Sequence, residues 1–392
     1  MNFAGCLLEV EMHDILKCKR HLFDIPEDVV YLNTAYISPL SFKVLESIRQ
    51  GSILESRPWE IFPNYHFFDC LDEVKSLFAK LFNIKSKNVA LIPSTSYGIS
   101  TAAKNIKVCA NKKIIILKDQ FPSNVYPWFD LAEQSGGNLQ ILDLGHSTDI
   151  TSAIIKCIDE RVAAVAIPNV RWTDGAIIDL HRVKESCRQC KAKLILDLTQ
   201  SAGAMETDLS LIQPDFAVIA NYKWMLGPYS TGFLYVSDEF LDGQPLEQTW
   251  SGRKDSDDFS RLTDYQSEYQ SGASRFDMGE RANFSLLPGV KAALDQLDAW
   301  GIENIQNTLN ANALMLCTAL GKLGLTTLDA AQRAPHFISV RLPSTDSTEI
   351  LSRLKENKIY ISERSGYLRI TPHLWNTEDD FTKFIGVLEE II

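Results

Sequence analysis

Residues 217–236 read AVIANYKWMLGPYSTGFLYV, and this stretch decides the fold. An apolar run stops at Lys223, a Gly-Pro turn follows, and a second apolar run completes the stretch, which predicts a strand, an exposed lysine, a turn and a strand. An ammonium group beside Tyr222 and Trp224 has little water around it. Desolvation lowers the pKa of a lysine and makes it a usable amine nucleophile. A plain surface lysine in a loop fits this stretch equally well, so the rest of the chain has to decide.

Outward from this stretch, short apolar segments alternate with amphipathic ones. The apolar segments predict strands at 88–92, 113–117, 139–142, 162–167, 194–197, 216–220 and 233–236. Apolar residues at helical spacing predict helices between them, at 96–105, 126–134, 150–158 and 180–190. Strands that are apolar on both faces and separated by helices are typical of a mostly parallel sheet covered on both sides, so we expect an α/β fold.

The ends of the chain differ from this pattern. From residue 286 onward, long helices and short strands predict a smaller α+β domain, and 7–23 predicts a short helix. We therefore expect a large domain at 26–285 and a small domain formed by 1–25 and 286–392. The polar stretch 238–276 predicts either an ordered insertion near the site or a loose surface loop.

Composition limits the classes of function. The chain has 392 residues, 45% hydrophobic and 23% charged, as in an ordinary globular protein. Its net charge of −11, with both signs mixed, argues against a nucleic-acid surface. The start, MNFAGCLLEVEMHD, predicts neither a secretory signal nor a membrane span. Among the eight cysteines, the single pair Cys187 and Cys190 is a weak metal signal, so we expect no metal, reduced cysteines and a cytoplasmic setting.

Two polar motifs follow predicted strands, where ligands bind in open parallel sheets. Thr95 and Ser96 open a helix after the strand at 88–92, and hydroxyls with free N–H groups there form an anion site, although a plain helix cap is the simpler explanation. Asp197 ends the strand at 194–197. A buried carboxylate needs a cationic partner, for which a protonated pyridine nitrogen would serve, with Gln200 near a ring hydroxyl. A helix-capping aspartate is the alternative.

Two further motifs complete the set. Phe121 follows the strand at 113–117, where its ring could cover a planar cofactor or simply fill the core. Arg369 lies between apolar residues of a short strand, and burying it is costly unless it binds an anion, such as a substrate carboxylate, or an internal acid. The order anion loop, aromatic ring, aspartate, lysine and arginine indicates a pyridoxal-phosphate site in which the protein supplies the Schiff-base lysine.

The sequence resembles the class V aminotransferase family of fold-type I pyridoxal-phosphate enzymes, which includes cysteine desulfurases, kynureninase and isopenicillin N epimerase. The motifs DLTQSAG, NYKWMLGP, FDMGERANF and LRITPHLWNT match in order, and the resemblance extends from YLNTAYISP to RITPHLWNT. It implies a seven-stranded, mainly parallel sheet domain, a small C-terminal domain, and a homodimer with sites at the subunit interface.

Position by position, the resemblance gives roles to the residues above. Lys223 resembles the lysine that binds the cofactor, Asp197 the partner of the pyridinium nitrogen, and Gln200 the residue near the ring oxygen. Phosphate contacts are implied for Thr95, Ser96 and Tyr222, ring stacking for Phe121, and substrate carboxylate binding for Arg369. We expect Tyr36 and Trp172 to contribute to substrate selectivity.

Three departures from the family pattern matter. The stretch 361–367, ISERSGY, has no cysteine where desulfurases carry their nucleophile, so we expect no cysteine desulfurase activity. The family often has Gly-Thr in the segment that reaches the partner's phosphate, whereas this chain has Gly279-Glu280-Arg281, of which Arg281 but not Glu280 suits an anion. Trp172 replaces an asparagine near the ring, which leaves Gln200 as the candidate for the ring oxygen.

These inferences predict a pyridoxal-phosphate enzyme that acts on an amino-acid substrate through an external aldimine. Aminotransferase-like or isopenicillin N epimerase-like chemistry ranks first, and a C–S or C–C lyase second. A catalytically silent protein that binds the cofactor or an amine is the alternative of another class. No nucleic-acid or membrane partner is expected.

Overall fold

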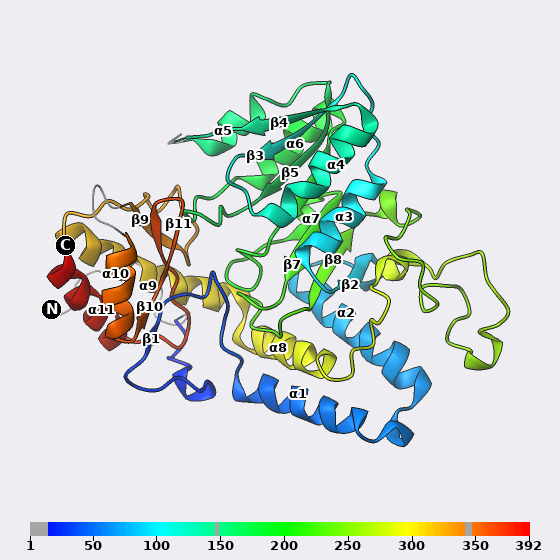
Figure 1. Ribbon diagram of the computed structural model, residues 1–392, viewed down its shortest axis with the longest axis horizontal. Helices are drawn as coiled ribbons and strands as arrows, with labels where there is room; N and C mark the ends of the chain where they lie inside the picture. Colours follow the sequence, from blue (N-terminus) through cyan, green and yellow to red (C-terminus); the bar gives the residue numbers. More distant parts are fainter. Residues whose placement is uncertain (1–14, 146–148, 342–346) are drawn as a thin grey trace.

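The computed structural model describes residues 15–145, 149–341 and 347–392. At its centre lies a seven-stranded sheet with the order β2-β8-β7-β6-β5-β3-β4 (Figure 1). Its strands are β2 (Val89–Ile92), β3 (Lys113–Leu117), β4 (Asn138–Leu142), β5 (Val162–Pro168), β6 (Lys193–Asp197), β7 (Phe216–Ala220) and β8 (Gly232–Val236). Neighbours run parallel except that β8 is antiparallel to β2 and β7. All seven predicted strands are present within one residue of their expected bounds, and the predicted α/β fold is confirmed.

Helices cover both faces of this sheet. Alternate strand residues explain why: Ile114 and Ile116 pack in one buried cluster with α3 and α4, whereas Ile115 and Leu117 pack in another with α2, α6 and α8. The helices are α2 (Cys70–Leu81), α3 (Thr95–Asn105), α4 (Tyr126–Ser135), α5 (Ile150–Ile155), α6 (Leu180–Cys190), α7 (Leu209–Ile212) and α8 (Leu287–Trp300). The four helices predicted between the strands are therefore found.

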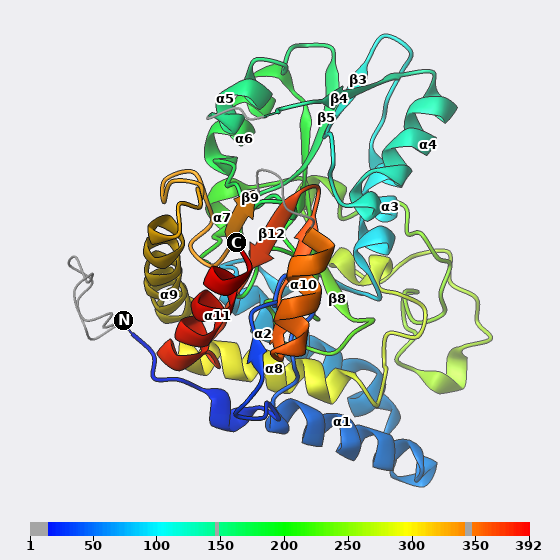
Figure 2. The same cartoon turned by 60° about the vertical axis from the view of Figure 1, so that its left-hand side comes forward.

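A second, antiparallel sheet organises the C-terminal part, with the order β11-β12-β9. Its strands are β9 (Ile338–Arg341), β11 (Ser362–Arg364) and β12 (Tyr367–Ile370), and its helices are α9 (Ile302–Lys322), α10 (Ser347–Glu356) and α11 (Glu378–Ile391). Figure 2 shows α10 and α11 in front of this sheet. Apolar residues of all three helices and of β9 and β12 share one buried cluster. We call this part the C-terminal lobe.

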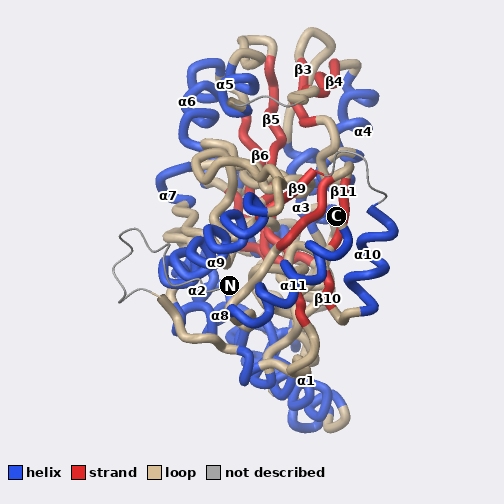
Figure 3. Tube along the Cα trace, turned by 90° about the vertical axis from the view of Figure 1, so that its left-hand side faces the viewer, coloured by secondary structure: helices blue, strands red, loops and turns tan. Residues whose placement is uncertain are grey.

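The N-terminal segment is attached to the same lobe. Strand β1 (Val30–Tyr31) pairs in parallel with β10 (Ile359–Tyr360). Of the helix predicted at 7–23, residues 7–14 lie outside the described residues, and 15–23 form only a 3-10 turn at Arg20–Leu22, so the helix prediction is wrong there. Helix α1 (Phe42–Glu55) then runs beside α8 (Figures 1 and 3). The division into domains at 26 and 285 stays a prediction.

The polar stretch 238–276 contains three short 3-10 turns and no longer element. It projects from the sheet on the side opposite the C-terminal lobe (Figure 1) and is braced by contacts such as the Lys254–Glu268 ion pair at 2.7 Å. It is therefore an ordered insertion, as one of the two predictions has it, but it does not line the cavity described below. Within the described residues, no helix has both the length and the apolar character needed to span a bilayer.

Candidate active site

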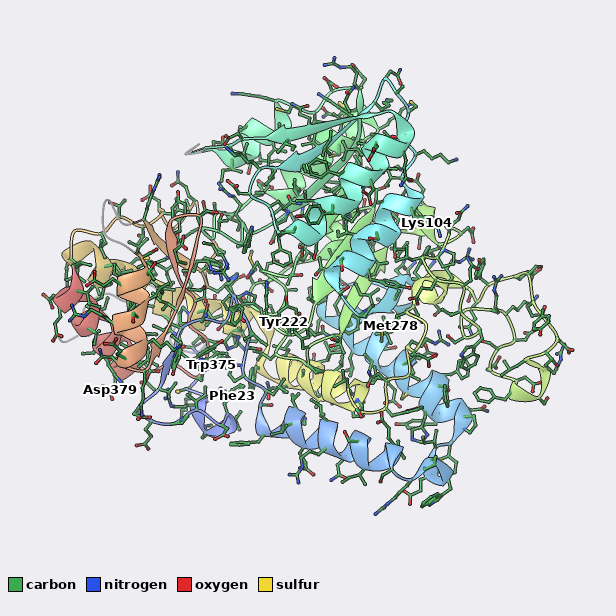
Figure 4. The ribbon with its side chains drawn as sticks, viewed as in Figure 1. Phe23, Lys104, Tyr222, Met278, Trp375 and Asp379 are labelled. Atoms are coloured by element: carbon green, nitrogen blue, oxygen red, sulfur yellow. The ribbon has the colours of Figure 1, made fainter. Side chains whose placement is uncertain are left out.

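Loops that follow five strands of the large sheet meet at one cavity. Thr95 comes after β2, Phe121 after β3, Trp172 after β5, Asp197 ends β6, and Lys223 comes after β7; all five line this cavity. The carboxyl ends of these parallel strands lie at one edge of the sheet, which is where ligands bind in such folds. Figure 4 shows Tyr222, the neighbour of Lys223, between the sheet and the C-terminal lobe. These five sequence-predicted residues thus come together at one cavity.

Lys223 is buried, with only 6% of its surface exposed. Its Nζ lies 5.4 Å from the centre of the Phe121 ring and 5.5 Å from that of Tyr222. Burial lowers the pKa of Lys223 from 10.5 to about 8, although the charge of Asp197 opposes this shift. The surface-lysine alternative is therefore wrong, because this amine lies in the interior of the protein.

Asp197 is a buried carboxylate at the last position of β6. Its Oδ1 accepts a hydrogen bond from the backbone N–H of Thr199 at 3.0 Å. Burial raises the pKa of Asp197, while the contacts with Thr199 and the charge of Lys223 act in the opposite direction. Within the described residues, no Lys, Arg or His nitrogen lies within 4.0 Å of either carboxylate oxygen, so Asp197 has no ion-pair partner.

Helix α3 begins at this cavity with Thr95. Ser94 caps the helix, its Oγ accepting from the N–H of Tyr97 at 3.2 Å. The first N–H groups of a helix have no partner within it, and they form an anion site at its N-terminus. Thr95 is buried and lines the cavity, whereas Ser96 is exposed and does not line it. The two predicted phosphate contacts therefore differ in position.

Gln200 is held at three points by distant parts of the chain. Its amide nitrogen donates to the carbonyl of Ala35 at 3.1 Å, and its amide oxygen accepts from Trp224 Nε1 at 3.0 Å. Its backbone carbonyl accepts from Nε2 of His336 at 2.7 Å, which places the proton of that ring on Nε2. One of its two amide hydrogens is thus used within the protein, and the other remains for a ligand.

Aromatic rings line one side of the cavity. Phe121 meets Trp172 edge to face, with ring centres 5.3 Å apart. Trp172 is fixed by a hydrogen bond of 2.6 Å from its Nε1 to the carbonyl of Asp119. Burial raises the pKa of Tyr222 to about 12, so its hydroxyl stays protonated as a potential donor. These rings exclude water from the side of the cavity on which Lys223 lies.

Arg369 and Tyr36 lie outside the cavity lining. Arg369 is only 1% exposed, donating to Ser362 Oγ and, through Nη1 at 2.9 Å, to the carbonyl of Trp172, which does line the cavity. No carboxylate lies within 4.0 Å of its guanidinium in the described part of the chain, so the internal salt bridge is not found. Tyr36 is 56% exposed, in a loop whose Ser38 bonds the carbonyl of Tyr222.

Other predictions have clear outcomes. Arg281 is buried and paired with Asp277 at 2.7 Å, and Lys75 joins the same carboxylate at 2.8 Å, so Arg281 already has its anion. Cys187 and Cys190 lie on α6 without a disulfide. Among the described residues, no group of three or more His, Cys, Asp or Glu is placed to hold a metal ion.

Two polar residues that line the cavity were missed at the sequence level. The Oγ1 of Thr199 accepts from the backbone N–H of Ala220 at 3.2 Å, which ties the loop after β6 to the end of β7. Gln120 is buried, and its Oε1 has no hydrogen-bond partner among the described residues. Both follow a predicted strand end by a few residues, and that position was the available signal.

The fold is that of the fold-type I class of pyridoxal-phosphate enzymes. Within this class, the chain belongs to the class V aminotransferase family: the family described as Aminotransferase class-V matches residues 63–372. The resemblance inferred from the motifs is confirmed, and pyridoxal phosphate is the cofactor of this family.

Similar proteins differ in their described activities. The uncharacterized aminotransferase YcbU of Bacillus subtilis is 26% identical over 322 residues, 77% of this chain and 79% of that one. A probable cysteine desulfurase of Pyrococcus abyssi is 23% identical over 349 residues, 82% of this chain and 83% of its own. The expectation that desulfurase activity is absent is therefore not confirmed.

Solved structures give a likeness of fold. Two structures of C-DES, a cystine C–S lyase, superpose with TM-scores of 0.87 and 0.84, both at 18% identity. The alignments cover 95% and 93% of this chain and 99% and 98% of theirs. The first has glycine covalently linked to its pyridoxal-phosphate cofactor, and the second holds cysteine persulfide.

The described residues fit this cofactor. Asp197 and Lys223 are buried and line one cavity, yet no ion pair joins them within 4.0 Å. An unpaired buried carboxylate is costly unless a cation meets it, and a protonated pyridine nitrogen is such a cation. The N-terminus of α3 suits a phosphate group at the same cavity.

Proposed function

We propose that this protein is a pyridoxal-phosphate enzyme that acts on an amino acid, with aminotransferase-like or isopenicillin N epimerase-like chemistry. The observation that carries the proposal is the pair Lys223 and Asp197, buried in one cavity and not joined to each other. Bound pyridoxal phosphate supplies an aldehyde that accepts an amine and an electron sink for breaking a bond at the substrate α-carbon.

Lys223 and Asp197 take the chemical roles in this proposal. Lys223 would hold the cofactor through its amine, and the same amine, when free, would move the substrate α-proton as a general base. Its pKa of about 8 suits this role, because a base works best when its pKa lies near the working pH. The carboxylate of Asp197 would keep the pyridine nitrogen protonated.

The other residues bind the cofactor and orient the substrate. The N-terminus of α3 with Thr95 Oγ1 binds phosphate, with Tyr222 as a further donor and Ser96 at the rim. Gln200 gives its free amide hydrogen to the ring oxygen, and Phe121 covers one ring face. Arg369 binds the substrate carboxylate, since its buried guanidinium lacks an anion. Trp172 and Tyr36 border the space left for the side chain.

Absorption and chemical trapping test the role of Lys223. Purified protein should show a visible cofactor band, and borohydride should fix the cofactor to the peptide containing Lys223, as read by mass spectrometry. Lys223→Ala should lose the fixed adduct, whereas Lys80→Ala, at an exposed lysine on α2, should keep it. An adduct on another lysine would overturn the assignment.

Product analysis separates the reaction types. With a panel of amino acids, a keto acid with the amine form of the cofactor indicates transamination, and an inverted amino acid alone indicates epimerisation. Ammonia with a keto acid indicates elimination by a C–S or C–C lyase, the second candidate, which the likeness to the cystine lyase C-DES favours. If no amino acid changes the spectrum, a silent binder is the better description.

Desulfurase activity remains a less favoured possibility in this proposal. The stretch 361–367 has no cysteine, and no cysteine of the described residues lines the cavity. Release of persulfide sulfur from L-cysteine, assayed beside the panel, would contradict this ranking.

We also propose a homodimer in a reducing, cytoplasmic compartment. Phe42, Leu45 and Ile53 of α1 are 42–51% exposed, and a mainly apolar groove of about 510 Å³ lies between α1, α2 and α8. A second copy of this chain would cover these apolar side chains. The seven described cysteines are free, as is typical of a reducing compartment. Light scattering after gel filtration tests the dimer, and a monomeric mass at micromolar concentration would contradict it.

A further inference from the structure

The hairpin formed by β11 and β12 carries two arginines on one face. In its register, Ser362 lies opposite Arg369, and Arg364 lies opposite Tyr367. Directly opposed residues of an antiparallel pair point to the same face, and side chains alternate along each strand. Arg364 and Arg369 are therefore diagonal neighbours on one face of the hairpin.

Both guanidinium groups lie beside a residue of the active-site cavity. The Cζ of Arg364 is 5.9 Å and that of Arg369 is 5.7 Å from the centre of the Trp172 ring. The charges of both arginines also lower the pKa of Lys223, after the larger effect of burial. The two cations thus act on the space in which a substrate amine would react.

Neither arginine has an anion of its own. Arg369 donates to Ser362 Oγ and to the carbonyl of Trp172, and Nη1 of Arg364 donates to the carbonyl of Glu363. Within residues 15–145, 149–341 and 347–392, no carboxylate oxygen lies within 4.0 Å of either group. Burial, followed by the charge of Arg364, lowers the pKa of Arg369 to about 10.

Several other buried or half-buried cations are paired, although in the described part of the chain buried Arg333 has no carboxylate within 4.0 Å. Lys75 and Arg281 share the carboxylate of Asp277, and Arg20 meets Asp380 at 3.0 Å. Two neighbouring guanidinium groups without an anion repel each other, and this cost is offset when each binds a negative group. A single α-carboxylate satisfies one of them and leaves the second unmatched.

We propose that the substrate carries two anionic groups, an α-carboxylate and an acidic group on its side chain, and that Arg364 and Arg369 bind one each. This inference rests on the proposed amino-acid chemistry of the site. It names the substrate class, acidic amino acids, and makes Arg364 the residue that selects the side chain. Arg364 uses one donor on the backbone, so the rest of its planar fork is available for a bidentate contact.

Unreactive acids test the two-anion site in the holoenzyme without any turnover. By calorimetry, succinate and glutarate should bind at least about tenfold more tightly than butyrate, which has one carboxylate. Arg364→Gln should weaken the two dicarboxylates by about tenfold to a hundredfold and change butyrate by less than about twofold. Arg188→Gln, at an exposed arginine on α6, should behave as wild type. Equal binding of succinate and butyrate, or an unchanged profile in Arg364→Gln, would overturn the proposal.

A second variant guards against a folding defect. Arg364→Lys keeps the positive charge but loses the planar guanidinium group that allows a bidentate contact. It should therefore retain part of the preference for dicarboxylates over butyrate. If Arg364→Gln loses the preference while Arg364→Lys retains none of it at an unchanged melting temperature, charge recognition by Arg364 is wrong.

Amino acids then separate this inference from the function on which it rests. L-Aspartate and L-glutamate should change the cofactor spectrum at lower concentrations than L-asparagine and L-glutamine, which have the same shape without the charge. If all four act equally, the acidic substrate class is wrong and the amino-acid chemistry stands. If none acts but dicarboxylate binding still depends on Arg364, the proposed enzyme function fails and the two-anion site stands.

Discussion

Lys223 shows how its surroundings change a single side chain. In water the amine would be almost fully protonated at neutral pH, because its pKa is 10.5. Burial lowers this pKa to about 8, so roughly a tenth of the molecules carry the neutral amine at pH 7. Asp197 limits the shift by attraction, and Arg364 and Arg369 extend it by repulsion.

The rate at which cofactor-free protein captures pyridoxal phosphate should depend on this pKa. Only the neutral amine attacks the aldehyde, so the rate should rise with pH and level off above about 8. Stopped-flow absorbance between pH 6 and pH 10 measures this. Asp197→Asn removes the stabilising negative charge, which should move the midpoint to lower pH; a midpoint near 10.5 in wild type would contradict the buried environment.

At the residue scale, the sequence predicted the site residues at and after strand ends, but it did not predict the hydrogen bonds that hold them in place. Asp197 and Lys223 could be found because each ends or follows a clear apolar run. The anchoring of Gln200 by Ala35, Trp224 and His336 could not, because its partners are far apart in sequence and only tertiary packing brings them together.

At the scale of elements, the turn after β6 has to fit closely against the turn that carries Lys223. Gly203 lies in the first of these turns with a φ of +91°, a conformation that side chains disfavour. A Cβ at this position would come within 2.3 Å of the carbonyl oxygen of Trp224. The glycine therefore allows the turn after β6 to pack directly against the main chain that follows Lys223.

Gly203→Ala should destabilise the protein by about 3 kcal/mol, since it combines backbone strain with a clash against main-chain atoms. Chemical denaturation measures the loss, and cofactor affinity should fall as well. Gly321→Ala on α9 is the control: no atom lies within 4 Å of the added methyl group, and alanine should stabilise the helix by up to about 1 kcal/mol. Similar effects of the two changes would refute the close packing of these turns.

Elements were predicted best where burial alone decides them. Six of the seven sheet strands are largely buried on both faces, β4 at the edge being partly exposed, and the bounds of all seven agree within one residue. The helix at 7–23 failed in its described part because residues 15–19 bind the C-terminal lobe instead, as in the bond from the N–H of Lys19 to the carbonyl of Leu374. Such a distant partner overrides local helical spacing.

At the scale of the whole molecule, two buried histidines join the large sheet to the C-terminal lobe. The ring of His336 lies 4.3 Å from that of Trp224, and His373 stacks on Trp375 at 4.7 Å. Neither ring nitrogen of His373 has a hydrogen-bond partner in the part of the chain described here. Burial lowers the pKa values of His336 and His373 to about 4 and about 3.

These shifts predict acid sensitivity. Below pH 6.5 the unfolded chain binds protons at both histidines while the folded chain does not, so stability should fall as the pH falls. Each histidine should contribute a loss of about 2 kcal/mol between pH 7 and pH 5. Urea denaturation at the two pH values measures it. His373→Phe should remove about half of the stability loss due to the two histidines. His181→Phe, at an exposed position on α6, should leave the loss between pH 7 and pH 5 unchanged. Equal pH dependence in wild type and both variants would refute the role of His373.

The pairing of β1 with β10 has a consequence for biosynthesis. Residues 30–31 are synthesised more than 300 residues before their partners at 359–360. The large sheet, whose last strand ends at residue 236, can form before the strands and helices of the lobe that carries Arg369 have been synthesised. A nascent chain would thus contain the sheet that positions Lys223 before it contains Arg364 and Arg369.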